Sequence, residues 1–326
     1  MCNSPLVSVI TPVYNHANYL GDYFAGLLAQ TYPNIELIII DDYSPDNSWK
    51  QIQQIAPQLR ERFHRVELRQ NNKNQGLLKT LQQLIPLAKG KYTAILESDD
   101  YYKPEKIATS VAYFEANPDI GLVHCEIDFS QGDTIQERHW EHLGRKIPIG
   151  NVYENLLQDN FVLTCGFSCR TEILQKHARL DEYIKRGYLT ADYPIFLDLA
   201  RHTRFGYIDQ SLAVYRVVEN SISHQQNPER HFKWNRAYYQ IKLDYIAEFG
   251  ASPEIISRAN QQFYWHHYKF GWATFKPDAF KLGRDGLQQY APQTISPMSH
   301  WVRALAMRSY QLWQLVRMFE SRIQAS

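Results

Sequence analysis

The sequence predicts an α/β fold in which helices flank a mostly parallel central sheet, followed by a helical C-terminal region. Short apolar runs with strand character alternate with helix-length segments as far as residue 127 of the 326-residue chain, which is the pattern of βαβ units. From about residue 231 onward the patterns are helical, and no second series of this kind occurs. We therefore expect two parts: residues 1–225 with the α/β fold and residues 226–326 with helices.

The first strands and helices are indicated by their composition and by the residues that end them. Residues 6–11 are an apolar, strand-like run that Pro12 closes. Residues 18–30 carry leucine and phenylalanine at helical spacing, and Tyr32-Pro33-Asn34 stops the helix. Residues 35–40 are rich in isoleucine and almost wholly apolar, which is typical of a strand covered on both faces.

The later elements continue the alternation. A helix over about 46–60, a strand over 65–69 and a helix over 77–88 precede the break at Gly90. A strand over 92–96 follows. Pro104 suits the first position of a helix that runs to Asn117, and residues 120–127 read as a further strand.

Polar side chains stand at the ends of three expected strands. They are Thr11 to Asn15 after the first strand, Asp41-Asp42 after the second, and Glu97-Ser98-Asp99-Asp100 after strand 92–96. Because parallel sheets bind ligands outside the carboxyl ends of their strands, we expect a site there. Grouped carboxylates are tolerated when a hard divalent cation such as Mg²⁺ or Mn²⁺ lies between them, and such a cation often bridges them to phosphate. Taken alone, the acids also fit a helix N-cap with solvated surface charges.

Composition excludes several classes of protein. A formal net charge of +1 argues against nucleic acid as a partner. Neither a Gly-x-x-x-x-Gly-Lys loop nor a Gly-x-Gly-x-x-Gly fingerprint occurs, which disfavours a P-loop nucleotidase or a Rossmann dehydrogenase. The four cysteines lack zinc-site spacing, and the sequence has no signal-peptide pattern and no membrane-spanning stretch. These features predict a cytoplasmic protein with free thiols.

Four motifs follow one another in a distinctive order. They are Val7 to Asn15, Gln30 to Ser44, Asn74-Gln75-Gly76, and Ala88 to Asp100. Together they resemble the family 2 glycosyltransferases over about residues 5–225. The resemblance implies the Rossmann-like GT-A fold and an inverting transfer from a nucleoside-diphosphate sugar, by default a UDP sugar. It also implies a divalent cation, Mn²⁺ or Mg²⁺, held by the strand-end acids against the donor diphosphate.

The resemblance assigns donor-side roles to seven residues. The nucleoside pocket would be lined by Thr11, Pro12 and Tyr14, and Asp42 would accept a hydrogen bond from the base. Asp100 would be the first metal ligand, Asp99 would contact ribose or metal, and Lys79 would reach phosphate. For Glu97, which occupies a position where the family often has aspartate, we expect a side chain that points away or contacts the ribose.

Two later segments also match the family. Thr190 to Ala200 resembles the segment with the catalytic base, which implies that Asp192 takes the proton of the acceptor hydroxyl. Tyr215 to Ser223 resembles the segment near the active-site lid, so Arg216 is expected to contact phosphate or to fix Asp192.

Two departures from the family pattern leave alternatives open. Ala191 replaces the acid that usually precedes the base, and Val218 replaces a histidine that often serves the metal or diphosphate; His224 is a candidate substitute. One alternative is a degenerate member that binds a nucleotide sugar or a partner without catalysis. A nucleotidyltransferase is another, although a Gly-rich basic loop after the first strand is missing.

The C-terminal segment 301–319 is amphipathic, with Trp301, Leu305, Leu312 and Leu315 on one face and arginines on the other. We expect this apolar face to pack on the protein or on another subunit, or to lie peripherally on the inner face of a membrane. Membrane contact would suit a lipid-linked acceptor, as in bacterial surface polysaccharide or glycolipid synthesis; a soluble carbohydrate is the other class of acceptor.

Overall fold

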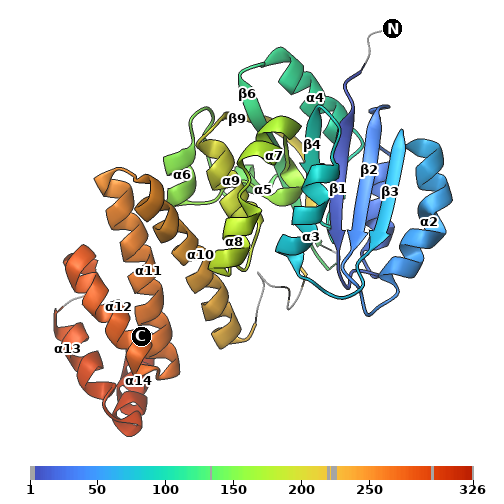
Figure 1. Cartoon of the computed structure of the whole chain (residues 1–326). Helices are drawn as coiled ribbons and strands as arrows, with labels where there is room; N and C mark the ends of the chain where they lie inside the picture. Colours follow the sequence, from blue (N-terminus) through green and yellow to red (C-terminus); the bar gives the residue numbers. More distant parts are fainter. Residues whose placement is uncertain (1–3, 133, 219–220, 222–225, 295–296, 325–326) are drawn as a thin grey trace. The chain divides into compact units, whose positions relative to one another are not determined.

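The computed structural model describes residues 4–132, 134–218, 221, 226–294 and 297–324. The chain divides into two compact units, Met1–Glu219 and Asn220–Ser326. The first contains a sheet with helices, and the second contains helices alone (Figure 1). The expected α/β fold with a helical C-terminal region is therefore confirmed.

The sheet of the first unit is mixed, with strand order β3-β2-β1-β4-β8-β6-β9-β5, and β7 pairs with β6. The first four strands along the chain form its parallel half: β1 (Val7–Val13), β2 (Ile35–Asp41), β3 (Arg65–Gln70) and β4 (Tyr92–Ile95). The other half contains β5 (Tyr101–Tyr102), β6 (Ile120–Gln131), β7 (Thr134–Gln136), β8 (Phe167–Arg170) and β9 (Arg204–Arg216). There β8 lies antiparallel between β4 and β6, β9 is parallel to β6, and β5 is antiparallel to β9.

All five predicted strands are present, but Pro12 does not close the first one. β1 continues to Val13 and pairs with β2 along its whole length. The amide of Val7 and the carbonyl of Val13 form hydrogen bonds on the β2 side of the strand. The backbone N–H and C=O groups of the even-numbered residues between them therefore point toward β4. Since β4 ends at Ile95, opposite Ile10, the missing N–H of Pro12 leaves no ladder bond unmade.

Helices cover the sheet of the first unit. In the parallel half they are α1 (Leu20–Leu28), α2 (Ser48–Arg62), α3 (Leu77–Leu84) and the 3₁₀ turn η1 (Ile85–Leu87). Further along they are α4 (Lys106–Ala116), α5 (His139–His142), α6 (Tyr153–Gln158), η2 (Thr164–Gly166), α7 (Thr171–His177), α8 (Leu180–Arg186) and α9 (Asp192–Ala200). Contrary to expectation, Pro104 precedes α4 instead of opening it; its carbonyl accepts the amide of Thr31.

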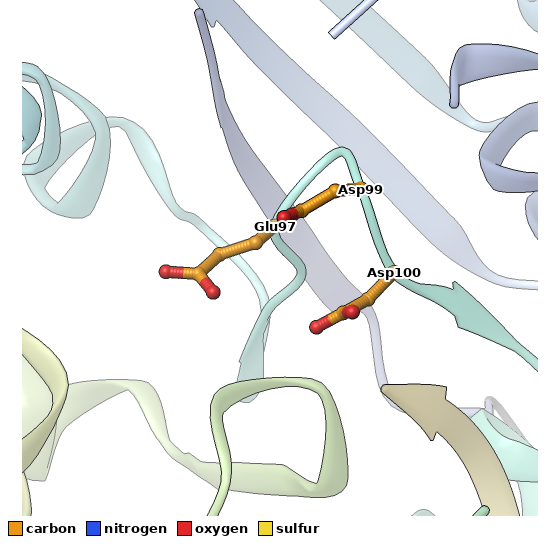
Figure 2. A group of neighbouring side chains, drawn as sticks. All are labelled: Glu97, Asp99 and Asp100. Atoms are coloured by element: carbon orange, nitrogen blue, oxygen red, sulfur yellow. The ribbon is translucent and has the colours of Figure 1, made fainter. Parts of the chain in front are cut away.

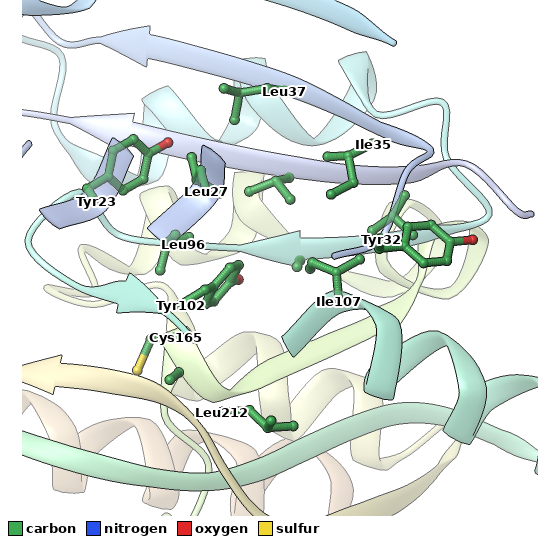
Figure 3. Packing of buried hydrophobic residues seen from close by; sticks show 14 of the residues in the cluster. Tyr23, Leu27, Tyr32, Ile35, Leu37, Leu96, Tyr102, Ile107, Cys165 and Leu212 are labelled. Carbon is green, nitrogen blue, oxygen red and sulfur yellow. The ribbon is translucent and has the colours of Figure 1, made fainter. Parts of the chain in front are cut away.

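The main core lies between the sheet and its helices. α1 contributes Leu27, β2 contributes Leu37, and Leu96 and Tyr102 come from the two ends of the connection between β4 and β5 (Figure 3). All four side chains are buried. The connection that carries the acids is therefore anchored in apolar packing on both sides.

The second unit consists of α10 (Pro228–Phe249), α11 (Pro253–Thr274), α12 (Pro277–Tyr290), the 3₁₀ turn η3 (Pro292–Thr294), α13 (Pro297–Ala306) and α14 (Tyr310–Gln324). Segment 301–319, expected as one amphipathic stretch, is split between α13 and α14 by a break at Met307–Ser309. No helix in the described part of the chain is long and apolar enough to cross a membrane.

Candidate active site

Three carboxylates gather on the loop between β4 and β5. One oxygen from each of Glu97, Asp99 and Asp100 lies within 4.8 Å of the others (Figure 2). The loop leaves the sheet at the carboxyl end of β4, next to the corresponding end of β1. The acids that the sequence placed at a strand end thus form one cluster.

The three carboxylates of the cluster repel one another when they are ionised. Burial raises the pKa of Glu97 well above its usual range, and the charges of Asp99 and Asp100 raise it further. Burial and the charge of Asp99 likewise raise the pKa of Asp100, although the backbone N–H of Arg216 opposes the rise. Like charges held together favour protonation or a bound cation.

The two oxygens of Asp100 have different surroundings. Oδ1 accepts the backbone N–H of Arg216 at 2.7 Å, which ties the end of β9 to the acidic loop. Oδ2 is buried and accepts no N–H or O–H hydrogen bond among the described residues; the Cys165 thiol, a weak donor, is close enough to Asp100 to lower its pKa. A buried carboxylate oxygen without an N–H or O–H donor suits a hard cation, and oxygen ligands from carboxylates are those that Mg²⁺ and Mn²⁺ take. The cluster therefore fits a divalent cation.

Asp99 lies nearer the solvent, beside the loop that follows β1. His16 Nδ1 is 3.8 Å from Asp99 Oδ1 and 2.8 Å from Ser98 Oγ. The side chains of His16 and Asp99 keep 27% and 19% of their exposure, so both are accessible from outside. Sequence reasoning did not single out His16, because nothing local links it to residue 99.

Asp192 is the first residue of α9, and the Thr190 hydroxyl donates to its carboxylate. Burial raises the pKa of Asp192, while the Thr190 hydroxyl and the backbone N–H of Tyr193 act in the opposite direction. A raised pKa makes a carboxylate a stronger proton acceptor.

A small cavity brings Asp192 to the acidic loop. Its lining includes Pro12, Glu97 and Asp192, together with apolar side chains such as Phe167 and Phe196. The charge of Asp192 contributes to the raised pKa of Glu97, so the two carboxylates influence one another. Pro12, near the end of β1, and Asp192, 180 residues later, thus share one cavity with Glu97 of the acidic cluster.

Asp42 is buried and holds the loop that precedes α3. Its carboxylate accepts the backbone N–H groups of Gln75 and Gly76 and the side-chain amide of Asn71 at 2.7–3.1 Å. Asp41 accepts both the amide and the hydroxyl of Ser44, as expected for the residue that holds the turn. These three donors take up most of the acceptor capacity of the carboxylate, so a base would bond to the remaining lone pair or replace one of the loop donors.

Two exposed tyrosines stand on the loops after β1 and β2. Tyr14 is 44% exposed and Tyr43 is 55% exposed. The loops are joined by a bond from the Asn15 amide to the Ser44 hydroxyl, and both Asn15 and Tyr43 have positive φ. Non-glycine residues rarely adopt positive φ, and such strain concentrates at ligand sites. Sequence reasoning named Tyr14 and missed Tyr43, although an aromatic residue directly after Asp41-Asp42 was a usable signal.

The remaining predicted residues lie in different surroundings. Thr11 is fully buried, and its hydroxyl accepts the hydroxyl of Tyr23 on α1, so its side chain supports the loop from the core. Lys79 is exposed on α3. The Arg216 guanidinium lies over the rings of Tyr19 and Tyr101 and pairs with Asp22. His224 lies outside the described residues.

The model of the family described as "Glycosyl transferase family 2" matches residues 8–177. Among curated proteins, the Escherichia coli UDP-Glc:alpha-D-GlcNAc-diphosphoundecaprenol beta-1,3-glucosyltransferase WfaP is 36% identical over 228 residues, covering 67% of this chain and 80% of WfaP.

Two solved structures are similar in fold. The mannosyltransferase PcManGT of Pyrobaculum calidifontis, solved with GDP-Man and Mn²⁺, gives a TM-score of 0.59 at 17% identity over 96% of this chain and 85% of that one. Residues 1–349 of Staphylococcus aureus TarS, solved with UDP-GlcNAc, give a TM-score of 0.57 at 17% identity over 87% of this chain and 80% of that one. Both support the GT-A fold.

Proposed function

The chain belongs to glycosyl transferase family 2, and we propose that it moves a sugar from a nucleoside-diphosphate sugar to an acceptor hydroxyl, with inversion at the anomeric carbon. One observation carries the proposal: Glu97, which clusters with Asp99 and Asp100, lines one cavity with Asp192 at the carboxyl end of the parallel strands. A donor diphosphate and a proton acceptor need to be adjacent in this reaction. Catalysis is assigned to the first unit, within residues 1–225.

We assign the donor to the loops that follow β1, β2 and β4. Tyr14 and Pro12 would line the nucleoside, with Thr11 behind them in the core. The Asp42 carboxylate would accept a hydrogen bond from the base at its remaining lone pair or in place of one from the loop. Asp99 and Asp100 would hold the Mn²⁺ or Mg²⁺ ion, which when bound supplies positive charge to the diphosphate. Lys79 and Arg216 are further candidates for contact with phosphate.

We assign the proton transfer to Asp192. Its carboxylate accepts the proton of the acceptor hydroxyl while that oxygen bonds to the anomeric carbon. The bond from this carbon to the diphosphate breaks, and nucleoside diphosphate leaves with both electrons of the bond. The raised pKa of Asp192 favours proton uptake, and the apolar side chains around it limit water.

The substrate classes are proposed from relatives. The name of WfaP specifies UDP-Glc as donor and a diphosphoundecaprenol-linked sugar as acceptor. For this chain we propose a UDP sugar as donor and a carbohydrate or lipid-linked acceptor, in surface polysaccharide or glycolipid synthesis on the cytoplasmic side of a membrane.

Donor binding and slow donor hydrolysis test the proposal. UDP-, GDP- and dTDP-sugars are titrated with Mn²⁺ and with chelator, and release of nucleoside diphosphate is followed. We expect metal-dependent binding of one donor and a hydrolysis rate that falls in Asp192→Asn. Release of pyrophosphate would instead indicate a nucleotidyltransferase.

A non-catalytic nucleotide-sugar binder is the second candidate, because Ala191 and Val218 replace side chains that serve catalysis in relatives. It predicts donor binding with no hydrolysis and no transfer to any acceptor. Turnover by the wild-type chain that is lost in Asp192→Asn would exclude it.

A further inference from the structure

The two C-terminal helices expose an unusual concentration of large apolar side chains. Of the 14 exposed large hydrophobic residues in the described part of the chain, seven lie between residues 301 and 318. They are Trp301, Val302, Leu305, Tyr310, Leu312, Leu315 and Met318. Exposed apolar residues scattered singly need no explanation, but a contiguous group marks an interaction site.

Within the second unit, α13 and α14 contact α11 through the sides that carry arginines. Arg303 lies over the ring of Trp272 and bonds to Glu320, and Arg317 donates to the carbonyl of Ala273. Trp313 is buried and donates to the carbonyl of Trp272. Arginine stems and guanidinium planes pack well on aromatic rings, which explains how a charged side can face the protein.

The opposite side exposes large apolar side chains. Trp301 and Leu305 are one helical turn apart on α13 and are 70% and 42% exposed. Leu312 and Leu315 are similarly placed on α14 and are 44% and 49% exposed. Packing of this face on the first unit or on another subunit, and contact with a membrane, all stay open at this point. We name these four residues the outer face (Figure 1 shows the two helices).

We propose that the outer face binds the surface of an anionic phospholipid membrane, with α13 and α14 lying in the headgroup region. The helices have 10 and 15 residues, about 15 and 22 Å, and are too short for a hydrocarbon core of about 30 Å. Helices with tryptophan and leucine outward and arginines at their flanks bind in the plane of the interface.

Charge favours lipid over a second copy of the chain. Between residues 297 and 324 there are four arginines and one glutamate, and Arg308 is exposed beside the outer face. A two-fold dimer through this face would bring the exposed Arg308 of one copy toward that of the other. Anionic headgroups attract basic residues near the membrane surface instead.

Co-sedimentation of the full chain with lipid vesicles tests the inference without any donor sugar. We expect binding to phosphatidylcholine vesicles that contain phosphatidylglycerol, weaker binding without it, and weaker binding at high salt. The double variant Trp301→Ser/Leu305→Ser should bind at least about tenfold less, since each loses an apolar side chain from the interface. Leu312→Ser/Leu315→Ser is a second variant with the same expected loss.

Leu282→Ser is the matched control, because Leu282 is 46% exposed on α12 and does not belong to the outer face. Its binding should equal that of wild type. Failure of the full chain to bind anionic vesicles at low salt would overturn the inference, and so would a dimer that Trp301→Ser/Leu305→Ser dissociates. Because vesicle binding needs no donor, its outcome is separate from that of the proposed transferase activity.

Discussion

Removing one charge from the acidic loop should make the metal-free protein more stable. In Asp100→Asn the side chain keeps an oxygen for the backbone N–H of Arg216 while the negative charge disappears. The oxygens of the cluster lie within 4.8 Å of one another, and at an effective dielectric of about 20 two such charges repel by about 3 kcal/mol. Because partial protonation already relieves some of this repulsion in the wild type, we expect the free energy of unfolding of Asp100→Asn to be higher by about 1–2 kcal/mol, or the Tm by about 2–8 °C.

The dependence on pH follows from the direction of the pKa shifts. The folded-state pKa values of Glu97 and Asp100 are raised above those of the unfolded chain. Their contribution to stability is therefore complete at low pH and is lost as the pH rises through the raised values. The advantage of Asp100→Asn should thus be small in acid and should grow toward neutral pH.

Thermal unfolding with chelator and with Mn²⁺, across a pH series, measures both effects. Mn²⁺ should raise the Tm of the wild type at neutral pH and have little effect on Asp100→Asn. Asp46→Asn is the control: the pKa of Asp46 is lowered by donors that include the Ser48 hydroxyl and the Ala17 amide, so the loss of its charge should destabilise the protein and leave the Mn²⁺ response intact. An Asp100→Asn variant less stable than wild type in chelator at neutral pH would refute the reasoning.

Three further predictions concern the base, the nucleoside loop and the core. Asp192→Asn should lower turnover by about 10²–10⁴ with donor affinity kept, and wild-type turnover should fall in acid above the ordinary carboxylate range, as the raised pKa of Asp192 requires; a rate that is flat there in steady-state assays would contradict this. Asp42→Asn should weaken UDP binding roughly tenfold in calorimetric titrations because the loop loses a charged acceptor, and unchanged affinity would exclude that role. Gly90→Ala should cost about 2 kcal/mol in denaturant unfolding, because its Cβ would lie 2.6 Å from the Ser8 amide, whereas Gly21→Ala meets nothing within 4 Å; equal stabilities would be inconsistent with this packing.

The parallel half of the fold was predictable because its strands are marked locally. Residues 35–40 are all buried in β2, as a nearly all-apolar run indicates. In the other half only β6 was predicted, because β5 has two residues and β8 has four, and each is defined by a partner distant in the chain. Pairings of that kind leave little periodic pattern.

The site was predictable to the same extent. Asp99 and Asp100 are neighbours in sequence, so their proximity is a local fact. The cavity that Glu97 shares with Asp192 joins residues 95 positions apart, and the bond from Tyr23 to Thr11 depends on how α1 packs. In the C-terminal segment hydropathy indicated two faces, but it did not reveal the break at Met307–Ser309 or the stacking of Arg303 on Trp272.

The acidic loop is fixed at both ends, by β4 in the middle of the sheet and by β5, whose Tyr102 is buried under α1 and pairs with Ala213 of β9. A cation arriving there meets ligands whose backbone is already ordered, so binding loses little conformational entropy. The same anchoring fixes the length of the loop. An inserted residue would have to bulge out of the loop and move the acids, or shift β5 by one residue and turn Tyr102 from the core toward the opposite face of the sheet. Either change would disturb the spacing of the three carboxylates.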